Sequence, residues 1–232
     1  MHEVSAFRMF FVRRRVRLRR TYSGGMKRID IREGQTVCAL GKSFLINVVG
    51  EGGDRSRARV AEGAVNISLA EGLSGRQRGR TVSLLAVKAI SKGIMPDLLS
   101  HVNEINARHF GVELSRLDLR DQKSRWGSYS KHTNSIYLNF RLLFAPPEVM
   151  DYVIVHELAH IRELNHSRAF WALVGGAMPD YKEKRKWLRK KGNSLGAFVR
   201  PAQGQEPAAP GVQADGLPQQ GTAETRSIQK RF

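Results

Sequence analysis

The chain has 232 residues, of which 41% are hydrophobic and 26% are charged, as in an ordinary soluble globular protein. No apolar run approaches the length that crosses a bilayer, and the basic residues near the N-terminus follow the apolar ones, which is the wrong order for a secretion signal. The single Cys38 excludes an intramolecular disulfide and a zinc site built from cysteines, so we expect a cytoplasmic protein.

The net charge of +18 lies in residues 1–200, because the acidic and basic residues of 201–232 cancel. A surface of this charge favours contact with a polyanion such as nucleic acid. The alternative is a solvated basic surface without a dedicated partner, and no nucleic-acid recognition motif in the sequence decides between the two. The sequence gives no prediction of the oligomeric state.

Residues 1–76 are predicted to form a basic, strand-rich N-terminal segment. Arginines alternate with apolar residues from Arg15 to Arg19, which suits a strand with its arginines in water, and a nucleic-acid-binding arm is the alternative. Glycine-bearing turns separate further β-prone pieces at 27–33, 44–49 and 57–70. We therefore expect a small antiparallel sheet in this segment.

A long helix is predicted next, from about Thr81 to Phe110, because apolar residues recur there at helical spacing. Pro96 lies inside this run and is expected to kink or split the helix, since proline cannot donate the backbone hydrogen bond. Gly111 is expected to end it, because glycine readily adopts the left-handed conformation of a helix C-terminus.

The remaining elements follow from alternation, periodicity and composition. We predict a strand at 117–121, a polar loop at 122–134 and a half-buried strand at 135–143, where apolar and polar residues alternate. Three helices are predicted after these strands, over about 147–164, 167–176 and 180–191. Pro, Gly, Gln and Ala dominate residues 201–232, so we expect a disordered tail.

The most informative motif is His-Glu-Leu-Ala-His at 156–160. Two imidazoles four residues apart project from the same side of a helix, so His156 and His160 can bind one metal ion together. Glu157 would lie beside the water that this metal activates and act as its general base. The alternative is a set of core groups that each need a hydrogen-bond partner, whereas one divalent cation satisfies them all. The motif therefore predicts a zinc hydrolase.

An open catalytic zinc site needs a third protein ligand, and His166 is the first candidate. On an unbroken helix it would lie about 9 Å beyond His160 along the axis, which is too far to share a metal. The helix must therefore end near residues 164–165, with Asn165 in a left-handed turn. Glu183, on a later predicted helix, is the rival ligand.

Further motifs recur in this order in a known family: Ser124–Ser128, Ile136–Asn139, Ala145–Glu148, His166–Ser167 and Phe170–Trp171. On these motifs the chain resembles the YgjP-like metallopeptidases, which are related to the SprT-like zincins. The resemblance is specific over about residues 115–191. One departure is Tyr129, where relatives often carry cysteine.

This resemblance implies an α+β fold in which a zincin-like metallopeptidase domain, over residues 77–200, packs its active-site helix on a small sheet and follows the basic strand-rich segment. It also implies one Zn²⁺ held by His156, His160 and His166, with Glu157 as the catalytic residue. The expected substrate is a peptide or protein.

The functional hypothesis is thus a zinc-dependent metallopeptidase that uses a metal-activated water. The edge of the strand at 135–143 is expected to pair with an extended substrate, and the loop at 122–129 to border the cleft. Lys123, Arg125 and Tyr129 are candidates for stabilising the oxyanion, or are simply solvated or packed. Two alternatives stay open: a metal-dependent nucleotide phosphohydrolase, and a nucleic-acid-associated protein with a zinc site.

Overall fold

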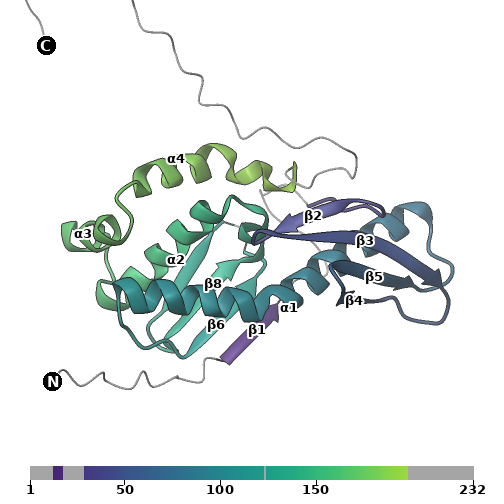
Figure 1. Ribbon diagram of the computed structural model, residues 1–232, viewed down its shortest axis with the longest axis horizontal. Coiled ribbons are helices and arrows are strands. Elements are labelled where there is room, and N and C mark those ends of the chain that lie inside the picture. Colours follow the sequence, from purple (N-terminus) through teal and green to yellow (C-terminus); the bar gives the residue numbers. More distant parts are fainter. Residues whose placement is uncertain (1–12, 18–28, 123, 198–232) are drawn as a thin grey trace, which may run out of the picture. The chain divides into compact units, whose positions relative to one another are not determined.

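Two four-stranded sheets and four α-helices make up the part of the chain that the computed structural model describes, residues 13–17, 29–122 and 124–197 (Figure 1). One sheet has the strand order β2-β3-β5-β4 and the other has the order β1-β6-β8-β7. The α+β fold class predicted from the sequence is therefore confirmed. No helix in the described ranges has the length and apolar character that a membrane span requires. The predicted tail at 201–232 lies outside these ranges.

The N-terminal sheet consists of β2 (Thr36–Ala39), β3 (Lys42–Glu51), β4 (Arg57–Ala61) and β5 (Ala64–Leu69). Two hairpins join β2 to β3 and β4 to β5. Their two-residue turns, Leu40-Gly41 and Glu62-Gly63, have positive φ at both positions, as type I′ turns require. The hairpins associate through parallel pairing of β3 with β5, so the expectation of a purely antiparallel sheet was wrong.

Residues 29–32 are not a strand, although the sequence predicts one at 27–33. Ile29 and Ile31 are fully buried, and the backbone between them bonds to a helix instead of a sheet. The hydroxyl of Ser83 donates to the Ile29 carbonyl at 2.8 Å and accepts from the Ile31 amide at 3.2 Å. A helical side chain therefore satisfies the polar groups that a neighbouring strand would otherwise bind.

The second sheet consists of β1 (Arg13–Arg17), β6 (Arg116–Arg120), β7 (Gly127–Ser130) and β8 (Ser135–Asn139). Strands β1, β6 and β8 are parallel, and β7 is antiparallel to β8 at the edge of the sheet. Because β1 pairs with β6, the first strand of the chain belongs to this sheet. The division into a segment over 1–76 and a metallopeptidase domain over 77–200 stays a proposal.

Strand β8 is interior to its sheet, and all five of its residues are buried. The predicted half-buried strand over 135–143 is therefore wrong in two respects. The strand ends at Asn139, and Phe140–Phe144 form a buried 3₁₀ helix, η1. A strand with neighbours on both edges and packed elements on both faces has no solvent-facing side, whatever its sequence alternation.

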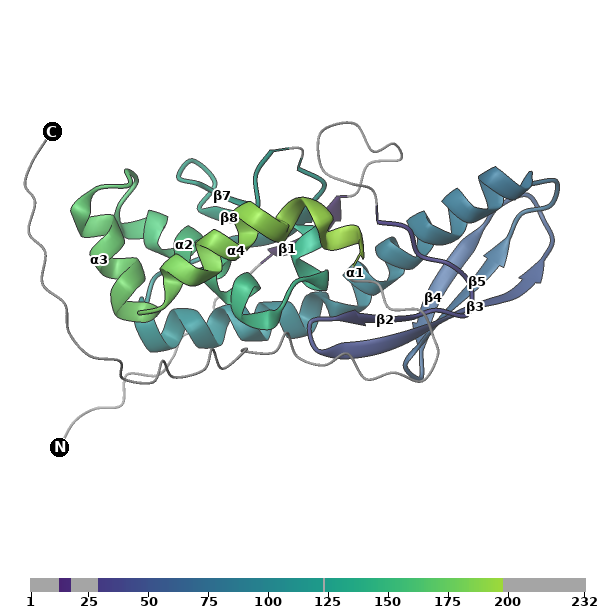
Figure 2. The ribbon, with the colours of Figure 1, turned by 90° about the horizontal axis from the view of Figure 1, so that it is seen from above.

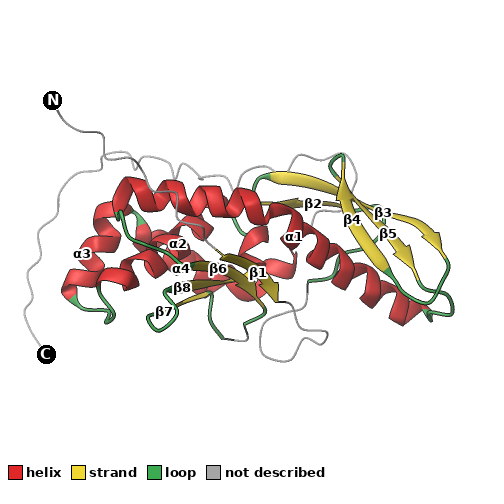
Figure 3. Cartoon of the chain, turned by 90° about the horizontal axis from the view of Figure 1, so that it is seen from below, coloured by secondary structure: helices red, strands yellow, loops and turns green. Residues whose placement is uncertain are grey.

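Helix α1 (Gly75–His109) begins at Ser74, which forms a capping box with Gln77, and contacts both sheets and α2 (Figures 2 and 3). The helix continues through Pro96, so the predicted split does not occur. Ile94 and Leu98 are buried on either side of the proline, and this continuous apolar stripe outweighs the lost hydrogen bond. Gly111, with φ of +58°, follows its end as predicted.

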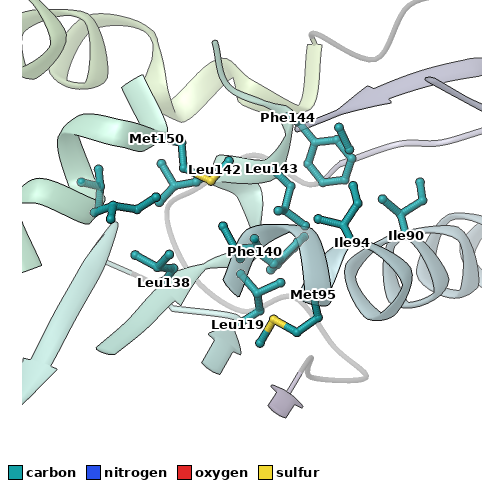
Figure 4. Close-up of a cluster of buried hydrophobic side chains, with 14 of the residues drawn as sticks. Ile90, Ile94, Met95, Leu119, Leu138, Phe140, Leu142, Leu143, Phe144 and Met150 are labelled. Carbon is teal, nitrogen blue, oxygen red and sulfur yellow. The ribbon is translucent and has the colours of Figure 1, made fainter. Parts of the chain in front are cut away.

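Three helices follow η1: α2 (Pro147–Arg162), α3 (Arg168–Ala177) and α4 (Tyr181–Lys191). All three agree with the sequence predictions to within two residues. Figure 4 shows the core between the second sheet, η1 and α1, where Phe140 lies among Met95, Leu119 and Leu138. This core fixes η1, and η1 in turn contacts α2, so the sheet positions the helix that carries the His-Glu-Leu-Ala-His motif.

Candidate active site

Helix α2 carries both histidines of the motif and the glutamate between them, and it contacts β7, β8, α3 and α4, which Figure 2 labels. Pro147 fixes the first helical turn, and Glu148 interacts favourably with the positive end of the helix dipole. His156 and His160 lie one turn apart and are half-buried, whereas Glu157 is only 4% exposed. The helix therefore presents two imidazoles to one side and a buried carboxylate beside them.

The chain reverses directly after α2 and returns His166 to the other two histidines. The helix ends at Arg162, and the reversal uses an extended residue, Glu163, with φ of −133° and ψ of 108°. The expected left-handed conformation of Asn165 is wrong; its carbonyl accepts from the Ser167 amide at 2.8 Å instead. Ser167 then caps α3, so the turn is fixed at both ends.

The three imidazoles converge. Their ring centroids are 4.9 Å apart for His156 and His160, 5.0 Å for His156 and His166, and 4.8 Å for His160 and His166. One nitrogen from each ring lies within 4.8 Å of the others, and the two Nε2 atoms of His156 and His166 are 3.1 Å apart. Tetrahedral zinc with Zn–N bonds of 2.0–2.1 Å separates its ligand nitrogens by about 3.3 Å, so this donor set fits zinc.

The protonation of the histidines also suits a metal. Burial, followed by the neighbouring histidines, lowers the pKa of His156 to about 3, and burial lowers the pKa of His160. Neutral imidazoles offer a lone pair for coordination. The Nδ1–H of His160 donates to the Glu163 carbonyl at 3.1 Å, which leaves its Nε2 free to coordinate. The buried Nδ1 of His156 has no hydrogen-bond partner among the described residues.

The Glu157 carboxylate lies directly below strand β7. A Cβ added to Gly127 would lie 2.5 Å from Glu157 Oε1, so only glycine leaves room for the carboxylate. Burial raises the pKa of Glu157 to about 8, against the opposing effects of a hydrogen bond from the Tyr129 amide and the positive charge of Arg125. The carboxylate therefore has a higher proton affinity than an exposed glutamate.

Two aromatic residues of α3 surround the histidines. Phe170 is fully buried, and its ring centroid lies 4.9 Å from that of His156 and 4.5 Å from that of His160. The Trp171 indole stacks on His166 at 5.7 Å. These contacts restrict the rotamers of the three histidines.

A pocket of about 380 Å³ opens beside Glu157. Three segments line it: residues 125–127 before and at the start of β7, one face of α2 from Tyr152 to Glu157, and one face of α4 from Arg185 to Arg189. Trp126 forms part of the wall and is supported by Gly192, where an added Cβ would clash with the indole. The expectation that the loop at 122–129 borders a cleft agrees with this pocket.

Several sequence predictions for the site need correction or remain open. Glu183 is exposed on α4 and is not a member of the histidine cluster, so it is not the third group of that cluster. Strand β8 has neighbours on both sides and offers no free edge to a substrate; the edge strands of its sheet are β1 and β7. Lys123 lies outside the described residues.

Sequence reasoning missed β7 and the two glycines, Gly127 and Gly192. The Trp-Gly-Ser sequence at 126–128 was the available signal, since a glycine inside a motif often marks a close approach. Its meaning depends on Glu157 lying across the strand, and no local pattern contains that information.

Comparison with known proteins places the chain in a family. Residues 12–191 match the model of the YgjP-like metallopeptidase domain. The crystal structure of the jannalysin metallopeptidase zymogen of Methanocaldococcus jannaschii is 24% identical over 39% of this chain and 91% of that chain, with a TM-score of 0.35. The abylysin metallopeptidase zymogen of Pyrococcus abyssi is 29% identical over 41% and 92% of the two chains, with a TM-score of 0.34.

The comparison with curated proteins gave no match. The family match extends beyond the region where the motifs of the sequence are most specific, and it covers strand β1 as well as α4. The family predicted from the sequence is therefore confirmed, and the chain belongs to the YgjP-like metallopeptidases, a family of metal-dependent hydrolases.

Proposed function

We propose that this protein is a zinc-dependent peptidase in which His156, His160 and His166 bind one zinc ion and Glu157 is the general base. The convergence of three imidazole nitrogens within 4.8 Å, next to a buried carboxylate, carries the proposal. The family membership supports peptide hydrolysis as the reaction. An α2 histidine pair and a third histidine after a chain reversal leave room for a further, non-protein ligand, as catalytic zinc sites require.

Zinc bound there would polarise the scissile carbonyl and lower the pKa of the attacking water. Glu157 accepts a proton from that water and delivers it to the leaving amine. Burial raises the pKa of this carboxylate to about 8, which favours its holding the transferred proton until the leaving amine takes it. The Tyr129 amide and Arg125 oppose this effect, and the positive charge of a bound zinc ion would oppose it further and favour the ionised base.

Strand β7 is the edge to which an extended substrate would add. The Asn139 amide donates to the Trp126 carbonyl at 2.8 Å, and hydrogen-bonded pairs alternate along an antiparallel ladder. Gly127 and Tyr129 therefore direct their backbone N–H and C=O groups away from β8. The Tyr129 amide donates a hydrogen bond to the Glu157 carboxylate. A peptide paired with this edge would bring its backbone to the Glu157 carboxylate.

Replacing Glu157 by Gln tests the general base. The variant keeps the shape of the side chain but cannot accept the proton, so we expect an unchanged zinc content and a loss of about 100- to 10,000-fold in casein hydrolysis. Metal analysis and a fluorescent casein assay measure the two quantities. Retained hydrolysis in E157Q would remove Glu157 from the mechanism.

The same preparation tests the alternative reactions. Purified, zinc-loaded wild type is incubated separately with casein and with nucleoside triphosphates. Release of phosphate without peptide cleavage would replace the peptidase proposal by a phosphohydrolase. Strongly salt-dependent DNA binding without any hydrolysis would favour a nucleic-acid-associated protein with a zinc site.

A further inference from the structure

The pocket beside Glu157 carries more positive charge than general-base chemistry needs. Arg125, Arg185 and Arg189 line it, and among the described residues Glu157 is the only acidic one that does so. Among the ion pairs between described residues, none involves any of these three arginines. Three guanidinium groups therefore share a pocket with a single carboxylate that the reaction itself uses.

The arginines are placed to act together. Arg185 and Arg189 are four residues apart on α4 and so lie on the same face of the helix. The Arg185 guanidinium lies over the Trp171 ring, 4.9 Å from its centroid, and this cation–π contact restricts its orientation. Arg125 enters the pocket from the segment before β7, so the charges come from two different walls.

His156 also lines the pocket, and the other side chains of its wall are aliphatic or aromatic. Tyr152, Val153 and Leu188 are all buried, and the half-buried Trp126 indole completes the wall. The three arginines are themselves exposed, so the attraction between one guanidinium and an anion is screened by water, and the pocket depends on the three charges acting together beside this apolar wall. The volume of about 380 Å³ is sufficient for a side chain together with adjoining backbone.

We propose that this pocket binds a carboxylate of the substrate peptide, so that an acidic residue near the scissile bond determines specificity. The inference rests on the proposed peptidase function and adds the substrate class. A carboxylate matches the planar fork of a guanidinium and forms two parallel hydrogen bonds with it. Its hydrocarbon stem would contact Trp126 and Leu188, whereas a lysine or arginine at the same position would be repelled.

Matched peptides test the proposal. We use short quenched fluorescent peptides that differ only by Glu, Gln or Lys, placed in turn at each position around the cleaved bond, on the zinc-loaded full chain. At one position or more, kcat/KM should be about tenfold higher for Glu than for Gln, equivalent to about 1.4 kcal/mol, and lowest for Lys. Amidated and free C-termini distinguish a side-chain carboxylate from the terminal one.

Variants on α4 attribute the preference to the pocket. In the double variant R185Q/R189Q, kcat/KM for the Glu peptide should fall to the value for the Gln peptide. The control K186Q/K190Q removes two charges at the same spacing from exposed residues of the same helix that do not line the pocket. This control should retain the wild-type preference for the Glu peptide. Arg189→Glu should shift the preference toward the Lys peptide, a reversal that a merely structural role would not produce.

Binding measured without turnover separates the two proposals. Fluorescence anisotropy with zinc-loaded E157Q should show about tenfold tighter binding of the Glu peptide than of the Gln peptide. Equal cleavage of all three peptides would overturn the inference and leave the peptidase proposal standing. If no peptide is cleaved, the peptidase proposal fails. Equal binding of the Glu and Gln peptides to E157Q would overturn the inference as well. Stronger displacement by ATP than by the Glu peptide would reassign the pocket to a phosphate group.

Discussion

Single residues decide the geometry around Glu157, and Gly127 is the clearest case. Strand β7 crosses the carboxylate so closely that a methyl group at Gly127 would lie 2.5 Å from Glu157 Oε1. The strand is held by its pairing with β8, so the Glu157 side chain would have to shift, and its burial makes that shift costly. A methyl group that an exposed position would tolerate is therefore excluded at Gly127.

We predict that Gly127→Ala lowers kcat/KM by about 100-fold, because it displaces the general base by an ångström or so. Zinc content should stay at the wild-type level, since the three histidines are not touched. The control is Gly79→Ala on α1, where an added Cβ meets open space. Wild-type activity in G127A would show that the base does not need its observed position.

The third histidine has a separate test. His166 is exposed, and it approaches the other two only through the reversal after α2. Replacing it by Ala should lower the zinc content of the purified protein strongly, since the site would keep two imidazoles. His132→Ala, an exposed histidine outside the cluster, is the matched control for elemental analysis. Full zinc occupancy in H166A would exclude the residue as a ligand.

At the scale of elements, packing overrides local preferences. Pro96 should end a helix, yet α1 continues because its buried stripe extends on both sides of the proline. Strand β7, with the sequence Gly-Ser-Tyr-Ser, has no alternation that would predict a strand. It forms because β8 offers a partner, which is a tertiary property.

Pro96→Ala is expected to raise the free energy of unfolding by about 1–2 kcal/mol. Pro96 is exposed, so alanine adds a helical hydrogen bond and better propensity, which exceeds the entropy that proline removes from the unfolded chain. Urea unfolding followed by circular dichroism measures the difference. A destabilised variant would indicate that the proline shapes the packing of α1.

At the scale of the whole molecule, metal binding at the three histidines is expected to affect the stability of the fold. The proposed ligands come from α2 and from the segment before α3, so a bound metal would link two elements that otherwise meet through side-chain packing. A ligand that binds only the folded state stabilises it by mass action.

Removal of the metal by a chelator should therefore lower the melting temperature. At zinc one hundred times above its dissociation constant the contribution is about 2.7 kcal/mol. The double variant H156A/H160A should melt at one temperature with or without zinc, which serves as the control in calorimetry. Identical melting of zinc-loaded and chelated wild type would argue against a metal at this site.

Local patterns were sufficient for the helices and for the residues of the histidine motif. Helical periodicity and capping depend on neighbours within a turn or two, so α2, α3 and α4 were predictable to within two residues. The His-Glu-Leu-Ala-His spacing is itself a local geometry. The resemblance of the chain to its family followed from several short motifs that occur in the same order along the sequence.

Only the tertiary structure decided that β7 and not β8 is an edge strand, how β3 and β5 pair, and which residues approach Glu157. These features join segments far apart in the sequence, and their formation depends on burying surface that no local window contains. The same holds for Arg185 and Arg189 of α4, which line one pocket with Arg125 although about 60 residues separate them from it in the sequence.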